Sequence, residues 1–281
     1  MFTVFGATGT VGRLVVAELV ARGEKVRAFV RDPAKADFGS EVELAIGDLT
    51  NSASIEPALT GADGIFMLSA GPDALTHDLN VAEHVARQSI PRVVKLSSVA
   101  AMPPVTNSYS ASHAQAEAAF AATGTELTVL RCAAFMSNLT QWSWSIAAEN
   151  RIYHSHGQIP RAMIDPADIA AVAAVALSGS GFPGTHQLTG PAAYTAPEAA
   201  RAVSIALGRD LEYIEADPEL GRAAMVGAGL PEEFVDGLLA EMAIPDPERG
   251  GVPLPTVREL LGREPRSLTD WLAEHAAELS G

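Results

Sequence analysis

The stretch GATGTVG, residues 6–12, decides the fold class of this chain. It follows a short apolar run and precedes an amphipathic segment that ends near Gly23. In such a strand–turn–helix context, one glycine permits the tight turn, one lets the backbone approach a pyrophosphate, and one lets the helix pack on the sheet. The spacing differs from G-x-G-x-x-G, and a plain turn is the alternative interpretation. We predict that this loop binds a dinucleotide, with contacts from Gly6, Thr8, Gly9, Thr10, Val11 and Gly12.

Apolar runs alternate with helical patterns through the first half of the chain. These runs lie at 2–5, 26–30, 42–46, 64–68, 92–98 and 127–131. Strands this apolar, separated by helices, indicate a parallel sheet that is covered on both faces. We therefore predict an α/β protein with a Rossmann-like, doubly wound parallel sheet and a small mixed, mostly helical C-terminal lobe. The predicted Rossmann domain is 1–135, with sheet elements also from 160–190, and the predicted substrate-binding lobe is 136–281, which is discontinuous.

The composition restricts the class of protein. The 281 residues carry a formal net charge of −15, which argues against direct binding of nucleic acid. A single cysteine excludes an intramolecular disulfide. We see neither a secretory leader nor an apolar run of the roughly 18 to 20 residues that a membrane helix needs. We expect a cytoplasmic monomer or homodimer that binds no membrane. We also predict no metal site, because His154 and His156 lack further ligands.

Charged residues follow the second and third predicted strands. In this fold an acidic residue after the second strand holds the ribose of NAD, whereas an arginine accommodates the 2′-phosphate of NADP. Arg31 and Lys35 favour NADP(H), although Arg31 can also be an ordinary surface charge. After the third strand, Asp48 can accept from the adenine amino group with Leu49 against the ring. The alternative for Asp48 is a helix cap.

A series of further motifs follows the glycine loop at fitting intervals. They read GDL, VVKLSSVAA, HAQAE, LTVLRCAAFMSNL, IDPADIAAVAAVAL and HQLTGPAAYT. Together with GATGTVG they resemble the NmrA-like branch of the atypical short-chain dehydrogenases, over nearly the whole chain to about His275. The resemblance implies an NAD(P)H-binding Rossmann domain with a small C-terminal lobe. Members of this family include quinone reductases and redox sensors without turnover, so the resemblance indicates the cofactor better than the chemistry.

The stretch YSASHAQAE contains the candidate catalytic residues, Tyr109 and His113. In the larger superfamily a tyrosine donates a proton to the substrate, and a lysine four residues later lowers its pKa and binds the nicotinamide ribose. Histidine stands in place of that lysine here, so we expect Tyr109 to be a poorer acid. His113 can hydrogen-bond the ribose or donate a proton itself. Glu117 can orient the imidazole or form a surface pair, and a merely polar helix face is the alternative.

Three strand ends supply further candidate cofactor contacts. Ser97 ends the fifth predicted strand, where it can contact the cofactor or substrate, or simply end the strand. Ala134 and Phe135 follow the sixth strand and, by the resemblance, flank the nicotinamide. The fourth strand ends in a segment whose backbone we expect to pass the cofactor, formed by Leu68, Ser69, Ala70 and Gly71.

Two function classes fit these residues. The first is an NADPH-dependent oxidoreductase that transfers hydride to a quinone or other conjugated carbonyl compound, with a biosynthetic ketone reductase as a narrower variant. A quinone needs less help from a general acid than a simple ketone, which agrees with the missing lysine. Trp142 and Trp144 can line a pocket for a flat substrate, or belong to the core and surface of the lobe. The second class is an NADP(H)-binding redox sensor that changes protein partners.

The position of Arg31 generates the first prediction. Arg31→Ala should weaken NADPH binding by about 1.5 to 3 kcal/mol, the value of a hydrogen bond to a charged group, and barely change NADH binding. Fluorescence titration of the variant with both cofactors measures this difference. Equal losses for NADPH and NADH would contradict the assignment.

Overall fold

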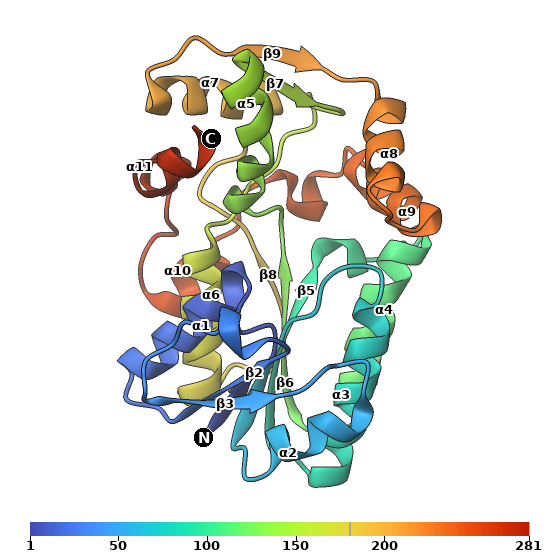
Figure 1. The fold of residues 1–281 in the computed structure, drawn as a ribbon, viewed down its shortest axis with the longest axis vertical. Helices are drawn as coiled ribbons and strands as arrows, with labels where there is room; N and C mark the ends of the chain where they lie inside the picture. Colours follow the sequence, from blue (N-terminus) through green and yellow to red (C-terminus); the bar gives the residue numbers. More distant parts are fainter. Residues whose placement is uncertain (180, 281) are drawn as a thin grey trace. The chain divides into compact units, whose positions relative to one another are not determined.

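A single seven-stranded sheet is assembled from strands within residues 2–188 in this computed structural model, which describes residues 1–179 and 181–280. Its strand order is β3-β2-β1-β4-β5-β6-β8, and the pairings from β3 through β5 are parallel. Helices α1 and α6 cover one face, and α2, α3 and α4 cover the other (Figure 1). The predicted Rossmann-like fold is therefore confirmed.

The strands are β1 (Phe2–Val4), β2 (Val26–Val30), β3 (Val42–Ile46), β4 (Gly64–Met67), β5 (Arg92–Ser98), β6 (Glu126–Cys132) and β8 (Gly184–Leu188). The helices are α1 (Thr10–Ala21), α2 (Ile55–Leu59), α3 (Ala74–Gln88), α4 (Ser108–Ala121) and α6 (Pro166–Ser178), with short 3-10 turns at Pro33–Lys35, Ser52–Ser54 and Val99–Ala101.

The chain divides into two compact units. Unit 1 comprises residues 1–105, 111–131 and 169–186. Unit 2 comprises residues 106–110, 132–168 and 187–281. Both units are assembled from separate stretches of the chain. The predicted division into a cofactor domain and a substrate lobe stays a prediction.

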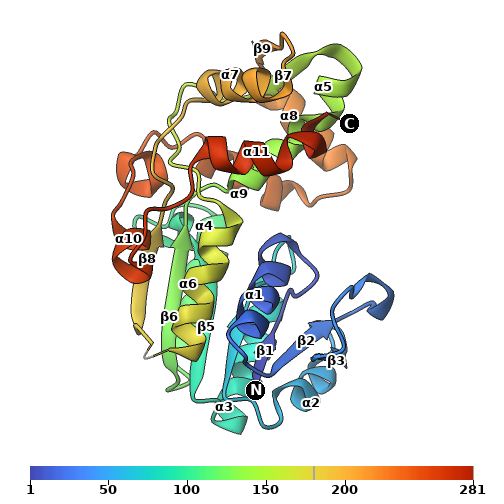
Figure 2. The same cartoon turned by 90° about the vertical axis from the view of Figure 1, so that its left-hand side faces the viewer.

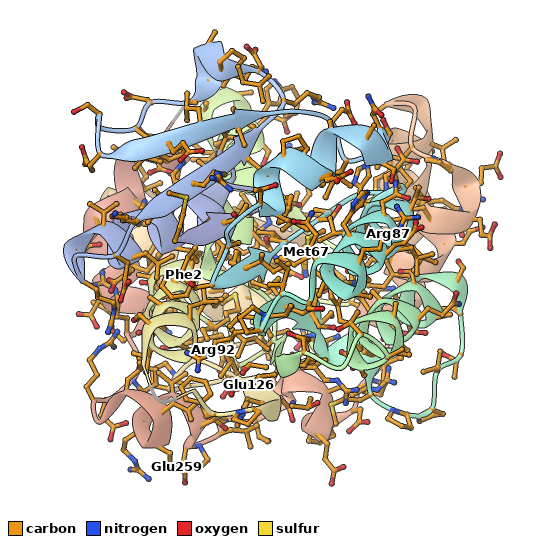
Figure 3. The ribbon with its side chains drawn as sticks, turned by 90° about the horizontal axis from the view of Figure 1, so that it is seen from below. Phe2, Met67, Arg87, Arg92, Glu126 and Glu259 are labelled. Atoms are coloured by element: carbon orange, nitrogen blue, oxygen red, sulfur yellow. The ribbon has the colours of Figure 1, made fainter. Side chains whose placement is uncertain are left out.

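The core of unit 1 lies between the sheet and its helices. Every residue of β4 is buried, as expected for a central strand that is covered on both faces. Arg92 and Glu126 are the first residues of β5 and β6. Their side chains lie 2.8 Å apart, and Figure 3 shows them together. The Arg92 guanidinium also donates to the carbonyl oxygens of Leu177 and Gly179, at 2.6 and 3.0 Å. One arginine thus joins β5, β6 and the end of α6.

Unit 2 contains a two-stranded parallel sheet, formed by β7 and β9 (Figure 2), and most of the remaining helices. Thr195 and Glu198 form a complete capping box at the start of α7, as the sequence predicts. The elements are a 3-10 helix (Met136–Trp142), α5 (Ser143–Glu149), β7 (Arg151–His154), α7 (Ala196–Leu207), β9 (Glu212–Glu215), α8 (Pro218–Gly227), α9 (Glu232–Met242), a helical turn (Pro247–Gly251), α10 (Thr256–Leu261) and α11 (Leu268–Leu279). Among the described residues, no helix combines the length and apolar character that crossing a membrane requires.

Two buried carboxylates at the start of α6 bind arginines from the end of the chain. Asp165 accepts from the Ala167 N–H at 2.8 Å, as expected of a helix cap, and its other oxygen lies 2.7 Å from Arg266 Nε. Asp168 is fully buried and lies 2.7 Å from Arg263 Nη1. Within unit 2, these ion pairs fix the segment that precedes α11 against the segment that leads into α6.

The close approach of α1 to the glycine loop generates the second prediction. A Cβ atom on Gly12 would lie 2.0 Å from the carbonyl oxygen of Gly6, which belongs to the backbone and cannot rotate away. Gly12→Ala should therefore lower the free energy of unfolding by about 3 kcal/mol, at the upper end of the usual cost of overpacking. Urea denaturation measures this loss.

Gly9→Ala is the matched control, because a Cβ atom there meets no atom nearer than 3.3 Å. Its loss should stay under about 1 kcal/mol, the cost of a less favourable N-cap. Similar losses for the two variants would show that the close approach does not limit stability.

Candidate functional site

The glycine loop presents backbone donors at the start of α1. Gly6 has φ of +71°, which an L side chain rarely adopts, and its carbonyl oxygen accepts from the Gly9 N–H at 3.0 Å. Gly9 is the N-cap of α1, and no side chain caps this helix end. The first N–H groups of the helix are thus available to an anion. Thr8 and Thr10 are accessible, whereas the Val11 side chain is buried, so Val11 can meet a cofactor only through its backbone.

The residues after β2 separate into two cations and one occupied carboxylate. Arg31 and Lys35 are both exposed. The carboxylate of Asp32 accepts from the Ala34 N–H at 3.0 Å and so caps a short 3-10 helix. A ribose hydroxyl would have to compete with that bond. The carboxylate is thus occupied, and recognition of a phosphate group by the two cations stays a prediction.

Asp48 follows β3 and closes a local turn. Its Oδ1 accepts from the Thr50 N–H at 2.9 Å and from the Thr50 hydroxyl at 2.7 Å. These two bonds, the backbone one first, lower the pKa of Asp48, and the charge of Arg31 adds a smaller effect. Leu49 packs partly against the core, and its carbonyl oxygen accepts from Asn80 Nδ2 at 2.8 Å. Asp48 is therefore ionised at neutral pH and held at the end of β3.

The end of β4 lies against the glycine loop. A Cβ atom on Gly6 would be 2.7 Å from the Leu68 carbonyl oxygen, so the two backbones approach closely. Ser69 Oγ lies 2.8 Å from Nδ1 of His77, which comes from α3. Gly71 has φ of +89°, and Ala70 is exposed. This segment thus lies next to the loop, and its contact with a cofactor stays a prediction.

Ser97, at the end of β5, is part of a buried ion-pair network. Its hydroxyl donates to Glu117 Oε1 at 2.6 Å, and Ser97 is only 2 % exposed. Glu117 also lies 2.6 Å from Nη2 and 3.0 Å from Nε of Arg131. Glu117 is therefore not a surface partner of His113 but a buried carboxylate that joins α4 to β5 and β6. The hydroxyl of Ser97 is engaged within the protein.

His113 lies one helical turn before Glu117 and close to a second buried ion pair. Lys95 Nζ, on β5, lies 3.1 Å from Asp78 Oδ1, on α3, and both side chains are almost fully buried. Burial, and to a smaller extent the positive charge of Lys95, lower the pKa of His113 to about 4, although Glu117 opposes the shift. The imidazole is consequently neutral at pH 7 and can donate a hydrogen bond, but it is not a reservoir of an acidic proton. At neutral pH it is therefore protonated less often than a histidine with the ordinary pKa.

Tyr109 belongs to unit 2, where it contacts α9. The Tyr109 and Phe234 rings are 5.8 Å apart at an interplanar angle of 67°. A Cβ atom on Gly237 would lie 2.8 Å from Tyr109 Cβ, so the helix backbone passes directly over this residue. Burial raises the pKa of Tyr109, and the charge of Glu241 raises it further. Tyr109 is thus a poorer acid than an ordinary tyrosine, as the sequence predicts.

Ala134 and Phe135 lie in an extended segment of unit 2. Phe135 forms a parallel bridge with Ile164. The Ile164 N–H donates to the Ala134 carbonyl oxygen, and the Met136 N–H donates to the Ile164 carbonyl oxygen, both at 2.9 Å. Their backbone is therefore well fixed, whereas their role beside a nicotinamide stays a prediction.

The tryptophans and histidines of unit 2 divide between core and surface. Trp142 is buried in the core, with its ring 6.1 Å from that of His154. Trp144 is 72 % exposed. In the described part of the chain, no three histidine, cysteine, aspartate or glutamate side chains gather in a way that could hold a metal ion.

Sequence reasoning missed the buried charges around His113. Lys95 and Asp78 form an ion pair between β5 and α3, and Arg131 binds Glu117 from β6. The available signal was a lysine inside the apolar run RVVKLSS, because an interior strand rarely carries a charge without a partner. The partner itself depends on which helix covers that strand.

Comparisons with known proteins agree on the cofactor class. A family model described as NAD(P)H-binding matches residues 6–179. A (4-alkanoyl-5-oxo-2,5-dihydrofuran-3-yl)methyl phosphate reductase of Streptomyces griseus is 34% identical, over 98% of each chain. An NAD(P)H azoreductase of Xenophilus azovorans is 30% identical, over 99% of this chain and 98% of its own. Among solved structures, an NADPH-dependent quinone oxidoreductase of Escherichia coli superposes with a TM-score of 0.82 at 23% identity, over 98% of this chain and 99% of its own, which supports the fold.

The neutral state of His113 generates the third prediction. Its pKa is about 4 in the folded protein against an ordinary 6.5, so the unfolded chain binds this proton first as the pH falls. The stability of the wild type relative to His113→Gln, which does not titrate, should fall by up to about 3 kcal/mol between pH 6.5 and 4. Urea denaturation across this range measures the difference, and NMR follows the imidazole directly. An imidazole that titrates near its ordinary pKa would contradict the prediction.

Proposed function

The chain belongs to the NAD(P)H-binding family, and from this premise we propose that it is an NADPH-dependent reductase of quinones and other conjugated carbonyl compounds. The names of its relatives support this substrate class. The Streptomyces griseus name describes a ring double bond conjugated to a carbonyl group, and the Xenophilus azovorans name describes reduction of azo compounds. In both kinds of acceptor, the negative charge that hydride transfer produces is delocalised.

The observation that carries the proposal is the weakness of the available acids. The pKa of Tyr109 is raised, and that of His113 is lowered so far that the imidazole is neutral. A simple ketone needs a proton donor for the oxygen that becomes an alkoxide. A quinone or an α,β-unsaturated carbonyl compound spreads this charge over its own π system and can take a proton from water. The residues present therefore suit a conjugated acceptor better than a simple ketone.

The arrangement of unit 1 fits an NADPH molecule. The close approach at Gly6 and the uncapped start of α1 form a cradle that side chains would fill. In this proposal the helix N–H groups hold the pyrophosphate, and Arg31 and Lys35 hold the 2′-phosphate. The bound cofactor supplies the hydride. Asp48 accepts from the adenine amino group, and Leu49 lies against the ring.

In this proposal, the remaining candidate residues position the nicotinamide end of the cofactor. Neutral His113 donates a hydrogen bond to the nicotinamide ribose, and the backbone of the segment after β4 passes alongside. Ser97 acts indirectly, because its hydroxyl is bound to Glu117 and steadies α4. Ala134 and Phe135 flank the nicotinamide and exclude water from it.

Steady-state oxidation of NADPH tests this function. Menadione and an enone should be reduced, whereas cyclohexanone should not. Intact NADPH binding without turnover of any conjugated acceptor would overturn the reductase and favour a redox sensor. Turnover of the simple ketone alone would favour the ketone reductase.

Tyr109→Phe provides the fourth prediction. Loss of a general acid costs roughly 10²-fold or more in rate. With menadione we expect Tyr109→Phe to lose less than about 10-fold, because the acceptor does not depend on that proton. His113→Ala should lose more, and its KM for NADPH should rise, because the ribose contact disappears. A Tyr109→Phe variant that is inactive on every acceptor, beside an unaffected His113→Ala, would show that the two roles are reversed.

A further inference from the structure

Arg161 lies in a segment of unit 2 whose backbone is hydrogen-bonded to that of the candidate residues Ala134 and Phe135. Its N–H donates to the Tyr194 carbonyl oxygen at 2.9 Å, and its own carbonyl oxygen accepts from the Tyr194 N–H at 3.0 Å. Three residues later, Ile164 pairs with Phe135. The segment that carries Arg161 is therefore fixed beside the segment that we propose to flank the nicotinamide.

Glu241 acts electrostatically on both Arg161 and Tyr109, which belong to the same unit. Its two carboxylate oxygens are occupied, one by Asn107 Nδ2 at 2.7 Å and the other by Arg249 Nη1 at 2.8 Å. Glu241 affects the pKa of both Tyr109 and Arg161, so both lie within its electrostatic range. Arg249 is only 4 % exposed and compensates the charge of Glu241 directly. Arg161 is left as a second cation in this neighbourhood.

Only one nitrogen of the Arg161 guanidinium makes hydrogen bonds within the described protein. Its Nη2 donates to the carbonyl oxygens of Met242, the last residue of α9, and of Ile244, at 2.7 and 3.3 Å. Among residues 1–179 and 181–280, no carboxylate lies within 4.0 Å of its nitrogens. Arginine has five N–H donors, so those on Nε and Nη1 have no acceptor in the described protein. Burial lowers its pKa, as expected for a cation that is partly removed from water.

Capping of α9 accounts for only part of this arrangement. A carbonyl cap needs one nitrogen, and a partly desolvated cation without a counterion is otherwise unfavourable. The fork of Nε and Nη1 has the geometry that binds two oxygens of one anion. We infer that Arg161 binds a carboxylate or phosphate group on the substrate of this reductase. The inference rests on the proposed function and adds a charged group to the conjugated acceptor.

Paired probe molecules test this inference. The first pair is a 1,4-naphthoquinone with a carboxyalkyl side chain and its methyl ester, and the second is the hydroxyalkyl analogue and its phosphate monoester. Affinities are measured by calorimetry on the protein saturated with NADP⁺, and kcat and KM are measured with NADPH. Arg161→Met should weaken binding of at least one anionic probe by about 10- to 100-fold, the value of a charge-assisted hydrogen bond, and raise its KM with little change in kcat. The two neutral probes should be unaffected.

Arg209→Met is the matched control. Arg209 also caps a helix in unit 2, with Nη2 2.8 Å from the Ile146 carbonyl oxygen, but its other bonds go to Asn150. This variant should leave the anionic-to-neutral ratio unchanged, and a thermal melt shows whether both variants stay folded. If Arg161→Met does not fold, Arg161→Gln takes its place with the same expectation.

Three outcomes would overturn the inference. They are equal changes for anionic and neutral probes, an equal effect in Arg209→Met, and failure of both anionic probes to bind the wild type. Selective binding of an anionic probe without turnover of any quinone would instead overturn the proposed reductase while supporting the anion site. A carboxylate preference and a phosphate preference are separated by the two probe pairs.

Discussion

The close approach of α1 to the glycine loop is the constraint on which the cofactor half of the molecule depends. A Cβ atom on Gly12 would meet the Gly6 carbonyl oxygen at 2.0 Å, and one on Gly6 would meet the Leu68 carbonyl oxygen at 2.7 Å. Three stretches of backbone thus meet with no side chain between them. Because the helix end carries no side-chain cap, its first N–H groups remain available to an anion. Close packing therefore requires glycine at these positions, and the proposed binding of a pyrophosphate uses the same close approach.

The sequence predicts those features that are local. The glycine loop, the alternation of strands and helices, and the capping box at Thr195 each depend on residues within one turn or one βαβ unit, and the structure confirms them. The family match also confirms the resemblance to NmrA-like proteins. The partners of Glu117 were not predictable, because Arg131 and Ser97 reach it only after the order of β5 and β6 is set. The lowered pKa of His113 was not predictable either, because it depends first on burial of the side chain and then on the charge of Lys95, and both follow from how α4 packs on the sheet.

Buried charge serves two distinct purposes in this protein. The pairs Lys95–Asp78 and Arg131–Glu117 join strands to helices beneath the candidate site, and each charge has its partner within 3.1 Å. Such pairs add little net stability, but removal of one partner leaves a buried charge uncompensated. Arg161 differs, because its guanidinium meets backbone carbonyl oxygens and no close carboxylate in the described chain. Paired charges thus join the elements of unit 1, whereas unit 2 contains a cation that we infer to bind an anion.

The ion pairs at the start of α6 have a consequence for synthesis of the chain. Asp165 and Arg266 are 101 residues apart in sequence, so the carboxylate emerges from the ribosome long before its cation is made. At roughly 5–20 residues per second, that interval is about 5 to 20 s. During it, Asp165 and Asp168 must stay hydrated, and unit 2 cannot reach its final packing. Closure of this unit is therefore a late event on the nascent chain, and a chaperone that shields its apolar surface would have to act within that interval.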